Sequence, residues 1–239
     1  LLLKSFVDGG KELEYMQMRR LHDMQVLQWR KLEAVKKAQA VSSPGDHLVI
    51  MHDGTSALGL PCLSRRSIKN LDPLRFEVTP WLAMDFSAGL KDYIYAPHPH
   101  TAKDSNTLIS QIHLVIRRAK SDYTHPRHRA RQLTMVADSA SENKNNVLFA
   151  YLSDMVRNGW FDEIILIFGP VGHTHNGVDA SHKVHNQNVA HHVAGDLGHF
   201  VRNYTKGFNG ANSEGHQRPS ASILAATVDW AKYYEPCLR

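Results

Sequence analysis

The stretch that decides the fold is Leu-Thr-Met-Val-Ala-Asp over residues 133–138, followed by Ser-Ala-Ser-Glu-Asn-Lys-Asn-Asn over residues 139–146. Its first five residues are mostly apolar or β-branched and predict a buried strand. Asp138 ends that strand and opens a polar segment that leads into a helix, predicted from about Asn143 to Asn158. We therefore expect an α/β unit in which the Asp138 carboxylate lies at the edge of a sheet.

Two other apolar segments have the same character. Residues 47–52 are rich in strand formers and end at Asp53, where Asp-Gly-Thr-Ser is typical of a turn. Residues 163–168, Glu-Ile-Ile-Leu-Ile-Phe, are apolar enough for a central strand. Strands that alternate with helices pair in parallel, because each helix carries the chain back along the sheet. We therefore expect the strands that end at Asp53 and Asp138 to be neighbours in one sheet.

The remaining elements complete the order of the fold. Residues 57–73 are predicted to be a loop, and strands are predicted over residues 75–86 and 90–95, around a turn at Gly89. Further helices are predicted over residues 106–120, 173–192, 197–206 and 220–234. A three-stranded meander followed by alternating strands and helices predicts a ribonuclease-H-like α/β fold, although other mixed α/β sheets share part of this order. We expect a mixed five-stranded sheet flanked by helices, with an N-terminal helical arm and C-terminal helices.

The N-terminal segment differs in character from the rest. No Pro or Gly occurs from Lys11 to Ser43, and charged and apolar residues intermingle. This predicts one helix over residues 10–41, which Ser-Ser-Pro-Gly at 42–45 ends. We expect a helical arm over residues 1–45 and a catalytic domain over residues 46–239.

Composition is that of a folded protein without a membrane span. Hydrophobic residues make up 42% and charged residues 21% of the chain, and no run approaches ~18 apolar residues. Cys62 and Cys237 lie far apart, which favours a reducing compartment. A net charge of +5 suits a polyanionic partner without requiring one. The sequence starts without Met, so we expect it to be part of a longer protein, and a homo-oligomer is compatible with it.

A third acid, Asp179, lies in the first turns of the helix predicted after residues 163–168. Clustered carboxylates repel one another, and a divalent cation relieves that repulsion. Hard oxygen ligands suit Mg²⁺ or Mn²⁺, and two such ions can activate a water or a hydroxyl for attack on a phosphodiester. We therefore expect Asp53, Asp138 and Asp179 to be catalytic, metal-binding residues.

Each acid also has a simpler explanation. Asp53 precedes residues that favour a turn, Asp138 precedes a helix start, and Asp179 gains from a helix dipole. The coincidence of all three acids at the expected points of the topology favours the metal interpretation.

A second set of metal ligands consists of His173 and His175 with Asp179 and His182, of which positions 175, 179 and 182 share one helix face. Imidazoles and a carboxylate suit Zn²⁺, but neither a His-Glu-x-x-His motif nor a complete structural zinc motif is present. Caps of the helix or hydrogen bonds to loops are the simpler explanation. The later histidines are interpreted as solvated: His185, His191, His192 and His199.

Several of these motifs together resemble a eukaryotic family of transposon-derived proteins. They are the Asp138–Asn146 segment, Phe-Ala-Tyr-Leu at 149–152, Gly-Trp-Phe at 159–161 and above all Gly-His-Thr-His-Asn-Gly-Val-Asp at 172–179. The family is an uncharacterised domain found in plants, invertebrates, algae and oomycetes. It is similar to cut-and-paste transposases with an Asp-Asp-Asp/Glu core. The resemblance is clearest over residues 130–192 and extends over residues 45–235.

The resemblance implies Mg²⁺-dependent cleavage and transfer of DNA strands, with DNA as the partner and the nucleus as the location. By position, Asp53 corresponds to the first acid, Asp138 to the second and Asp179 to the third, with Glu214 as a reserve for the third. Ribonucleases H carry a catalytic Glu on the helix after the third strand. No acid lies between Asn106 and Lys120, so the chain looks closer to a transposase.

Basic and amide side chains provide candidate contacts to DNA. Asn143 and Lys144 follow Asp138 closely and could reach a phosphate oxygen, although an ordinary helix start explains them equally well. Arg127, Arg129 and Arg131 form a compact basic loop that suits non-specific phosphate contact, with a solvated loop as the alternative.

Two other functions stay open at this level. A domesticated, inactive transposase core would bind DNA or protein without cleavage, and metal-dependent nicking distinguishes it. A Zn²⁺-dependent hydrolase would use His173, His175 and Asp179, and tightly retained Zn²⁺ would identify it.

Overall fold

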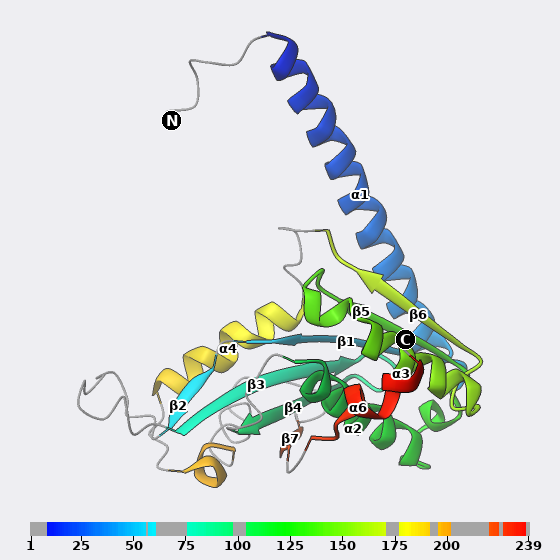
Figure 1. Ribbon diagram of the computed structural model, residues 1–239, viewed down its shortest axis with the longest axis vertical. Coiled ribbons are helices and arrows are strands. Elements are labelled where there is room, and N and C mark those ends of the chain that lie inside the picture. The colour runs from blue at the N-terminus through cyan, green and yellow to red at the C-terminus, as the bar shows by residue number, and fades with distance from the viewer. Residues whose placement is uncertain are drawn as a thin grey trace.

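The computed structural model describes most of the chain. The described residues are 9–55, 57–60, 76–97, 104–170, 177–191, 196–201, 220–224 and 227–237. They form a mixed seven-stranded sheet with helices on both faces (Figure 1). The predicted α/β class is confirmed, and the sheet is wider than the five strands expected.

The sheet is built around β1 (His47–Gly54), which is paired on both sides. It lies antiparallel to β3 on one side and parallel to β5 on the other. β4 continues antiparallel beside β3, and β6 continues parallel beside β5. The order is β6-β5-β1-β3-β4-β7, with β2 paired to β3. The other strands are β2 (Leu58–Leu60), β3 (Phe76–Asp85), β4 (Leu90–Pro97), β5 (Gln132–Ala137), β6 (Glu163–Phe168) and β7 (Ser220–Ile223).

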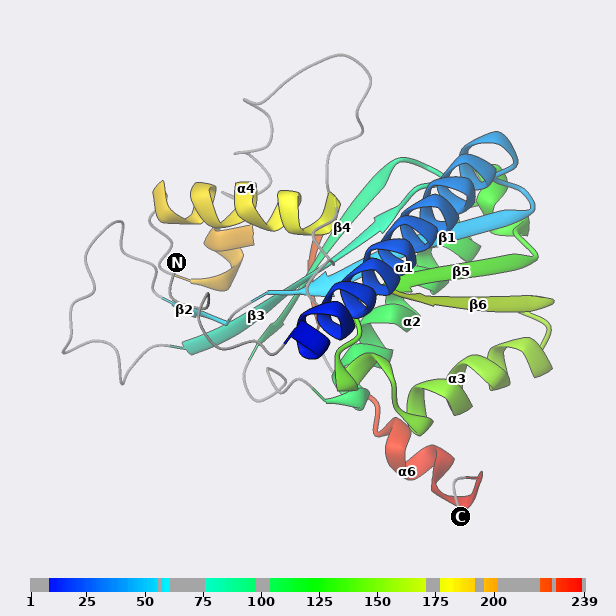
Figure 2. The same cartoon turned by 90° about the horizontal axis from the view of Figure 1, so that it is seen from above.

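The helices cover the two faces of the sheet (Figure 2). One face is covered by α2 (Ser105–Ser121), α3 (Asn146–Arg157) and α6 (Trp230–Tyr234), whose apolar residues form one core with the sheet. On the other face, α4 (Gly177–His191) and part of α1 (Gly9–Ser42) contribute Val178 and Trp29 to a second core. Successive residues of β1 point alternately into these two cores, as the period of a strand requires.

The predicted helical arm is present as α1, a helix of 34 residues. Trp29 and Ala40 in its second half are buried, whereas Leu13 and Leu21 in its first half are 60% and 56% exposed. The first half extends away from the sheet (Figure 1). Within the described part of the chain, no helix combines the length and the apolar character needed to cross a bilayer.

Three expectations about the elements were wrong. Residues 58–60, expected to be loop, form β2, and residues 220–223, expected to be helix, form β7. β7 pairs in parallel with the outer edge of β4, which supplies backbone partners that no local pattern reveals. The helix expected from Asn143 begins later, because Asn145 caps α3 by accepting the Leu148 N–H at 2.9 Å.

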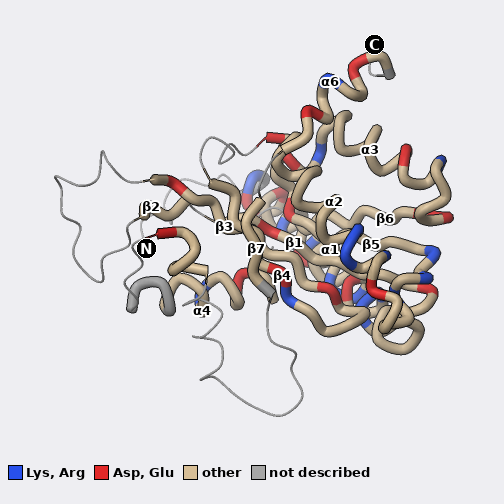
Figure 3. Tube along the Cα trace, turned by 90° about the horizontal axis from the view of Figure 1, so that it is seen from below, with Lys and Arg blue, Asp and Glu red and all other residues tan. Residues whose placement is uncertain are grey.

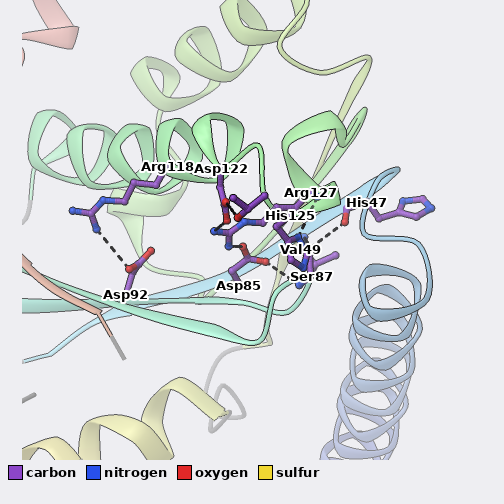
Figure 4. A network of polar contacts seen from close by, with 10 residues as sticks. His47, Val49, Asp85, Ser87, Asp92, Arg118, Asp122, His125 and Arg127 are labelled. Carbon is purple, nitrogen blue, oxygen red and sulfur yellow. Dashed lines mark hydrogen bonds and ion pairs between the residues drawn. The ribbon is translucent and has the colours of Figure 1, made fainter. Parts of the chain in front are cut away.

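A buried ion pair closes the end of the sheet at which β5 begins (Figure 4). Arg127 lies in the 3₁₀ turn η2 (Pro126–Arg129) and pairs with the buried Asp85 at the end of β3. A second guanidinium nitrogen of Arg127 lies 2.9 Å from Asp122. Asp85 also accepts the Ser87 N–H at 2.8 Å, and the Ser87 hydroxyl donates to the first carbonyl of β1 at 3.0 Å. The network therefore joins β1, β3 and the turn that precedes β5.

Replacing Arg127 is expected to destabilise the whole domain. In Arg127→Met the Asp85 carboxylate stays buried without its partner, so we expect the free energy of unfolding to fall by about 3–5 kcal/mol. Arg131→Met is the matched control, because Arg131 pairs with Asp162 at the surface and such pairs contribute about 1 kcal/mol or less. Chemical denaturation measures both changes. Equal losses in the two variants would contradict the structural role of Arg127.

Candidate active site

The carboxyl ends of β1 and β5 bring Asp53 and Asp138 together. The two strands are parallel neighbours, and Met51 lies opposite Val136. Asp53 and Asp138 each follow two residues later, so they continue the same register and belong to the same face of the sheet. The expected adjacency of the two strands is confirmed.

Asp53 and Asp138 are both among the residues that line a cavity of about 240 Å³. Two more acids line it, Asp104 before α2 and Glu142 in the 3₁₀ turn η3 (Ser141–Asn143). The other lining residues are His52, Gly54, Thr79, Trp81, Thr107, Leu108, Gln111 and Asn143. All of these residues are described, and none is Lys or Arg. The cavity is therefore rich in carboxylates and contains neutral hydrogen-bonding groups, which is the donor set of a hard cation.

The segment after β5 holds Asp138 in place. Asp138 Oδ1 accepts the Ala140 N–H at 3.0 Å and an Asn143 amide hydrogen at 2.6 Å. Asn143 is only 5% exposed, and its Oδ1 is buried without a hydrogen-bond partner among the described residues. An unpaired buried acceptor is costly unless a donor or a cation satisfies it. Asn143 therefore orients Asp138 and places another oxygen in need of a partner beside it.

His52 adds a neutral ring to the cavity rather than a positive charge. Its side chain is 2% exposed and packs against Trp81, with ring centroids 5.3 Å apart. Burial lowers the pKa of His52 from 6.5 to about 4, although the nearby Asp138 carboxylate raises it. Near pH 7 the imidazole is thus neutral. It does not compensate the charge of the surrounding carboxylates.

Asp179 lies on the opposite side of the sheet from α2, in the first turn of α4. One turn later, His182 Nε2 lies 3.3 Å from the main-chain oxygen of Asp53. Burial lowers the pKa of His182, while that carbonyl and Asp179 raise it. α4 therefore begins against the end of β1, but Asp179 is not among the residues that line the cavity.

Three predicted site residues, His173, His175 and Glu214, lie outside the described residues. Within the described part of the chain, no three His, Cys, Asp or Glu side chains are grouped as metal ligands.

The basic loop lies at the other end of the sheet from the cavity. It precedes β5, whereas Asp138 follows β5, so the length of the strand, roughly 20 Å, separates them. Arg127 is buried in ion pairs with Asp85 and Asp122, so the structure offers no exposed guanidinium at this position for a phosphate. Arg131 is exposed but bound by Asp162, with 2.6 Å between Nε and Oδ2. Figure 3 shows basic and acidic residues mixed along the trace near β5 and β6, and Arg131 is paired with the acidic Asp162.

The two residues predicted to reach phosphate from beyond Asp138 face different surroundings. Asn143 is buried and lines the cavity. Lys144 is exposed, with its Nζ 3.0 Å from Ser139 Oγ and 4.9 Å from the centroid of the Phe168 ring. Lys144 therefore stays available to an anion, whereas Asn143 can act only within the cavity.

The expectation that His185 is solvated was wrong. His185 is fully buried, its Nε2 lies 3.2 Å from the Tyr95 hydroxyl, and its ring stacks on Tyr93 at 5.5 Å between centroids. His199 is exposed, as expected. The side chains of His191 and His192 lie outside the described residues.

Sequence reasoning missed several residues of the cavity. Glu142 directly precedes Asn143, and its place in the same polar segment was an available signal. Asp104 caps α2 by accepting the Thr107 N–H at 2.7 Å, a helix-start signal that was not used. Since β4 runs in the same direction as β1, α2 starts at the edge where the cavity lies. His52, Trp81 and Gln111 carry no signal of their own, because their role follows from the packing of β1, β3 and α2.

The fold and the cavity together define a mixed α/β domain with an acidic site at the carboxyl ends of two parallel strands. Residues 66–239 match the model of a family described as a domain of unknown function (DUF7869), and the chain belongs to that family. The match includes Asp138 and Asp179 and begins after Asp53. No curated protein matches the sequence.

The buried histidine of α4 is expected to make folding sensitive to acid. Burial lowers the pKa of His185 from 6.5 to about 4, and a hydrogen bond with Asn186 raises it less than burial lowers it. Between pH 6.5 and 4 the unfolded chain therefore binds a proton that the folded chain does not. Stability is highest above pH 6.5 and falls toward pH 4, by up to about 3 kcal/mol from this group.

The variant that tests this is His185→Gln, which cannot titrate but can still hydrogen-bond to Tyr95. Urea denaturation at a series of pH values should show a shallower loss of stability below pH 6.5 than in the wild type. His199→Gln is the control at an exposed position and should keep the wild-type slope. The same slope in all three proteins would show that His185 does not contribute to acid sensitivity.

Proposed function

We propose that this chain is a ribonuclease-H-like, metal-dependent DNA nuclease and strand-transferase related to transposases, with Asp53 and Asp138 as its central carboxylates. The observation that carries the proposal is the parallel pairing of β1 and β5, which ends in one acid on each strand beside a shared cavity. DNA is the proposed substrate and partner, Mg²⁺ or Mn²⁺ the proposed cofactor, and the nucleus the proposed location.

The strand order supports this class of fold. An antiparallel meander of β1, β3 and β4 is followed by β5 and β6, added in parallel beside β1 through helical connections. This is the arrangement that the sequence predicts for a ribonuclease-H-like domain. The sheet also carries β2 and β7, which extend it on the side away from the two acids.

The donor set of the cavity supports a hard divalent cation. Such an ion, when bound, stabilises negative charge on the phosphodiester and lowers the pKa of a coordinated water or hydroxyl. Asp53 and Asp138 would hold it from adjacent strands. Asn143 keeps one oxygen of Asp138 engaged and so leaves the other directed to a ligand. His52 contributes no competing positive charge near pH 7.

The third acid has three candidates in this proposal. Asp179 is the residue that the resemblance assigns, and it lies in the first turn of α4, whose His182 contacts the main-chain oxygen of Asp53. Glu214, the reserve for that position, lies outside the described residues. Glu142 already lines the cavity with the other two acids. Mutation can separate Glu142 and Asp179, because they lie on different elements, η3 and α4.

Metal binding is expected to depend on Asp138. Wild-type protein should bind Mn²⁺ weakly on its own and more tightly with DNA present, because phosphates complete the coordination sphere. Isothermal titration of Asp138→Asn should show little Mn²⁺ binding in either condition. Asp162→Asn, at the opposite end of the sheet, is the control. Equal binding by wild type and Asp138→Asn would exclude Asp138 as a ligand.

Nicking of supercoiled plasmid with Mg²⁺ or Mn²⁺ should require both central acids. Asp53→Asn and Asp138→Asn keep the size of the side chain and remove its charge. We expect each to reduce nicking at least about 100-fold, with thermal stability unchanged or raised because repulsion between carboxylates is relieved. Asp162→Asn should nick like the wild type.

The same assay assigns the third acid, since only one of Asp179→Asn, Glu142→Gln and Glu214→Gln should match the loss seen with Asp138→Asn. A chelator control defines the background. If the wild type never exceeds that background with either metal, the nuclease proposal fails, and a binding module derived from a transposase takes its place.

A further inference from the structure

A second concave surface lies on the other side of the segment that holds Asp138. This groove, of about 520 Å³, runs between α1 and β6. Its wall on α1 consists of Gln25, Gln28, Trp29 and Leu32, and its other walls are Ser139, Lys144 and residues 165–170. The groove and the acidic cavity therefore share the segment after β5 as a common wall. Asp138, Glu142 and Asn143 line the cavity, and Ser139 and Lys144 line the groove.

The charge of the groove is opposite to that of the cavity. Of the described residues that line it, Lys144 alone is charged, and Lys144 makes no ion pair within the described part of the chain. The remaining side-chain donors are two exposed amides and an indole, since the Ser139 hydroxyl already donates to the Gly169 carbonyl. This is the donor set of a site for an anion that also carries hydrogen-bond acceptors.

An independent observation also points to a ligand. Trp29 is 8% exposed, and its indole N–H is buried without an acceptor among the described residues. A buried donor without a partner is costly, and an acceptor supplied by a ligand would remove that cost. Phe168, which is half-buried, further gives the groove an aromatic surface on which a planar ring can stack.

We propose that this groove binds a single-stranded stretch of DNA that continues from the strand held in the acidic cavity, so that α1 forms part of the nucleic-acid interface. The inference rests on the proposed function. Lys144 would contact a phosphate, the apolar and aromatic wall would receive bases, and Gln25 and Gln28 would reach base edges. An acidic peptide would satisfy Lys144, but it does not present a planar ring at every residue as single-stranded DNA does.

The test measures binding of a fluorescein-labelled oligothymidylate of about 12 nucleotides by fluorescence anisotropy, with excess chelator and at several salt concentrations. Each lost phosphate contact on a single strand should reduce the salt slope of log K by about 0.7. We expect this reduction for Lys144→Gln, with affinity about three- to tenfold weaker at low salt. Gln28→Glu, which places a negative charge in the groove, should weaken binding to a similar degree.

Two matched controls carry the same charge changes on α1 outside the groove. Lys31→Gln and Gln17→Glu are both at exposed positions and should bind like the wild type. The inference is overturned if the wild type does not bind the oligonucleotide, if the groove variants bind as the controls do, or if poly-glutamate competes as well as unlabelled oligonucleotide.

Failure here is distinguishable from failure of the proposed function. Asp138→Asn should keep oligonucleotide binding in chelator and lose nicking. If the wild type nicks plasmid but the groove variants bind normally, only the groove assignment falls. If the groove variants lose binding while the wild type never nicks, the nuclease proposal falls and the groove stands as a site for single-stranded DNA.

Discussion

The parallel pairing of β1 with β5 is the constraint on which the site depends. Because Met51 and Val136 are opposite one another, Asp53 and Asp138 leave the sheet at the same level, although β2, β3, β4, α2 and η2 lie between β1 and β5 in the chain. A slip of one residue between these strands would turn one carboxylate to the other face of the sheet. Both strands are buried on both faces, so the two cores hold that register from either side.

The opposite end of the same strand pair is fixed by charge rather than by apolar packing. Arg127 enters the interior just before β5 and pairs with Asp85 at the end of β3, while Ser87 ties Asp85 to the start of β1. Buried charges tolerate little displacement, because an unpaired partner is strongly destabilising. The ion pair thus limits sliding of β5 against β1 at one end of the strand pair, and the acids of the cavity lie at the other end. The residues that stabilise the fold and the residues of the candidate site therefore lie at opposite ends of β5.

Much of the fold could be predicted, because in the central part of the chain the spacing of apolar residues and the positions of turn-forming residues indicate the same elements. The sequence correctly predicts the strands that lead to Asp53 and Asp138 and the helix that begins near residue 105. Each of these elements has its own apolar pattern and its own residues that end it. β7 could not be predicted, because four residues without a pattern become a strand only against the edge of β4. The role of Arg127 was misjudged for a related reason. A basic loop looks solvated or phosphate-binding until Asp85, 42 residues away in the sequence, is brought beside it. For the site, the strand ends predicted two acids of the cavity, whereas Asp104 and Glu142 joined them through the start of α2 and the turn after β5.

The segment after β5, residues 138–144, forms a wall of both the acidic cavity and the groove that contains Lys144. On its cavity side, Asn143 donates a hydrogen bond to Asp138. On its groove side, Lys144 donates a hydrogen bond to Ser139 and lies over the ring of Phe168. Ser139 in turn donates to the Gly169 carbonyl at 2.7 Å, so the segment is anchored to the end of β6. A ligand in the groove that pulled on Lys144 would therefore act on a segment that also orients Asp138. Acids that attract a cation and a base that attracts a phosphate lie within a few residues of one another, on a support fixed at both ends. In the proposed function, a cation held by the acids and a phosphate held by Lys144 would compensate the two opposite charges that this segment presents.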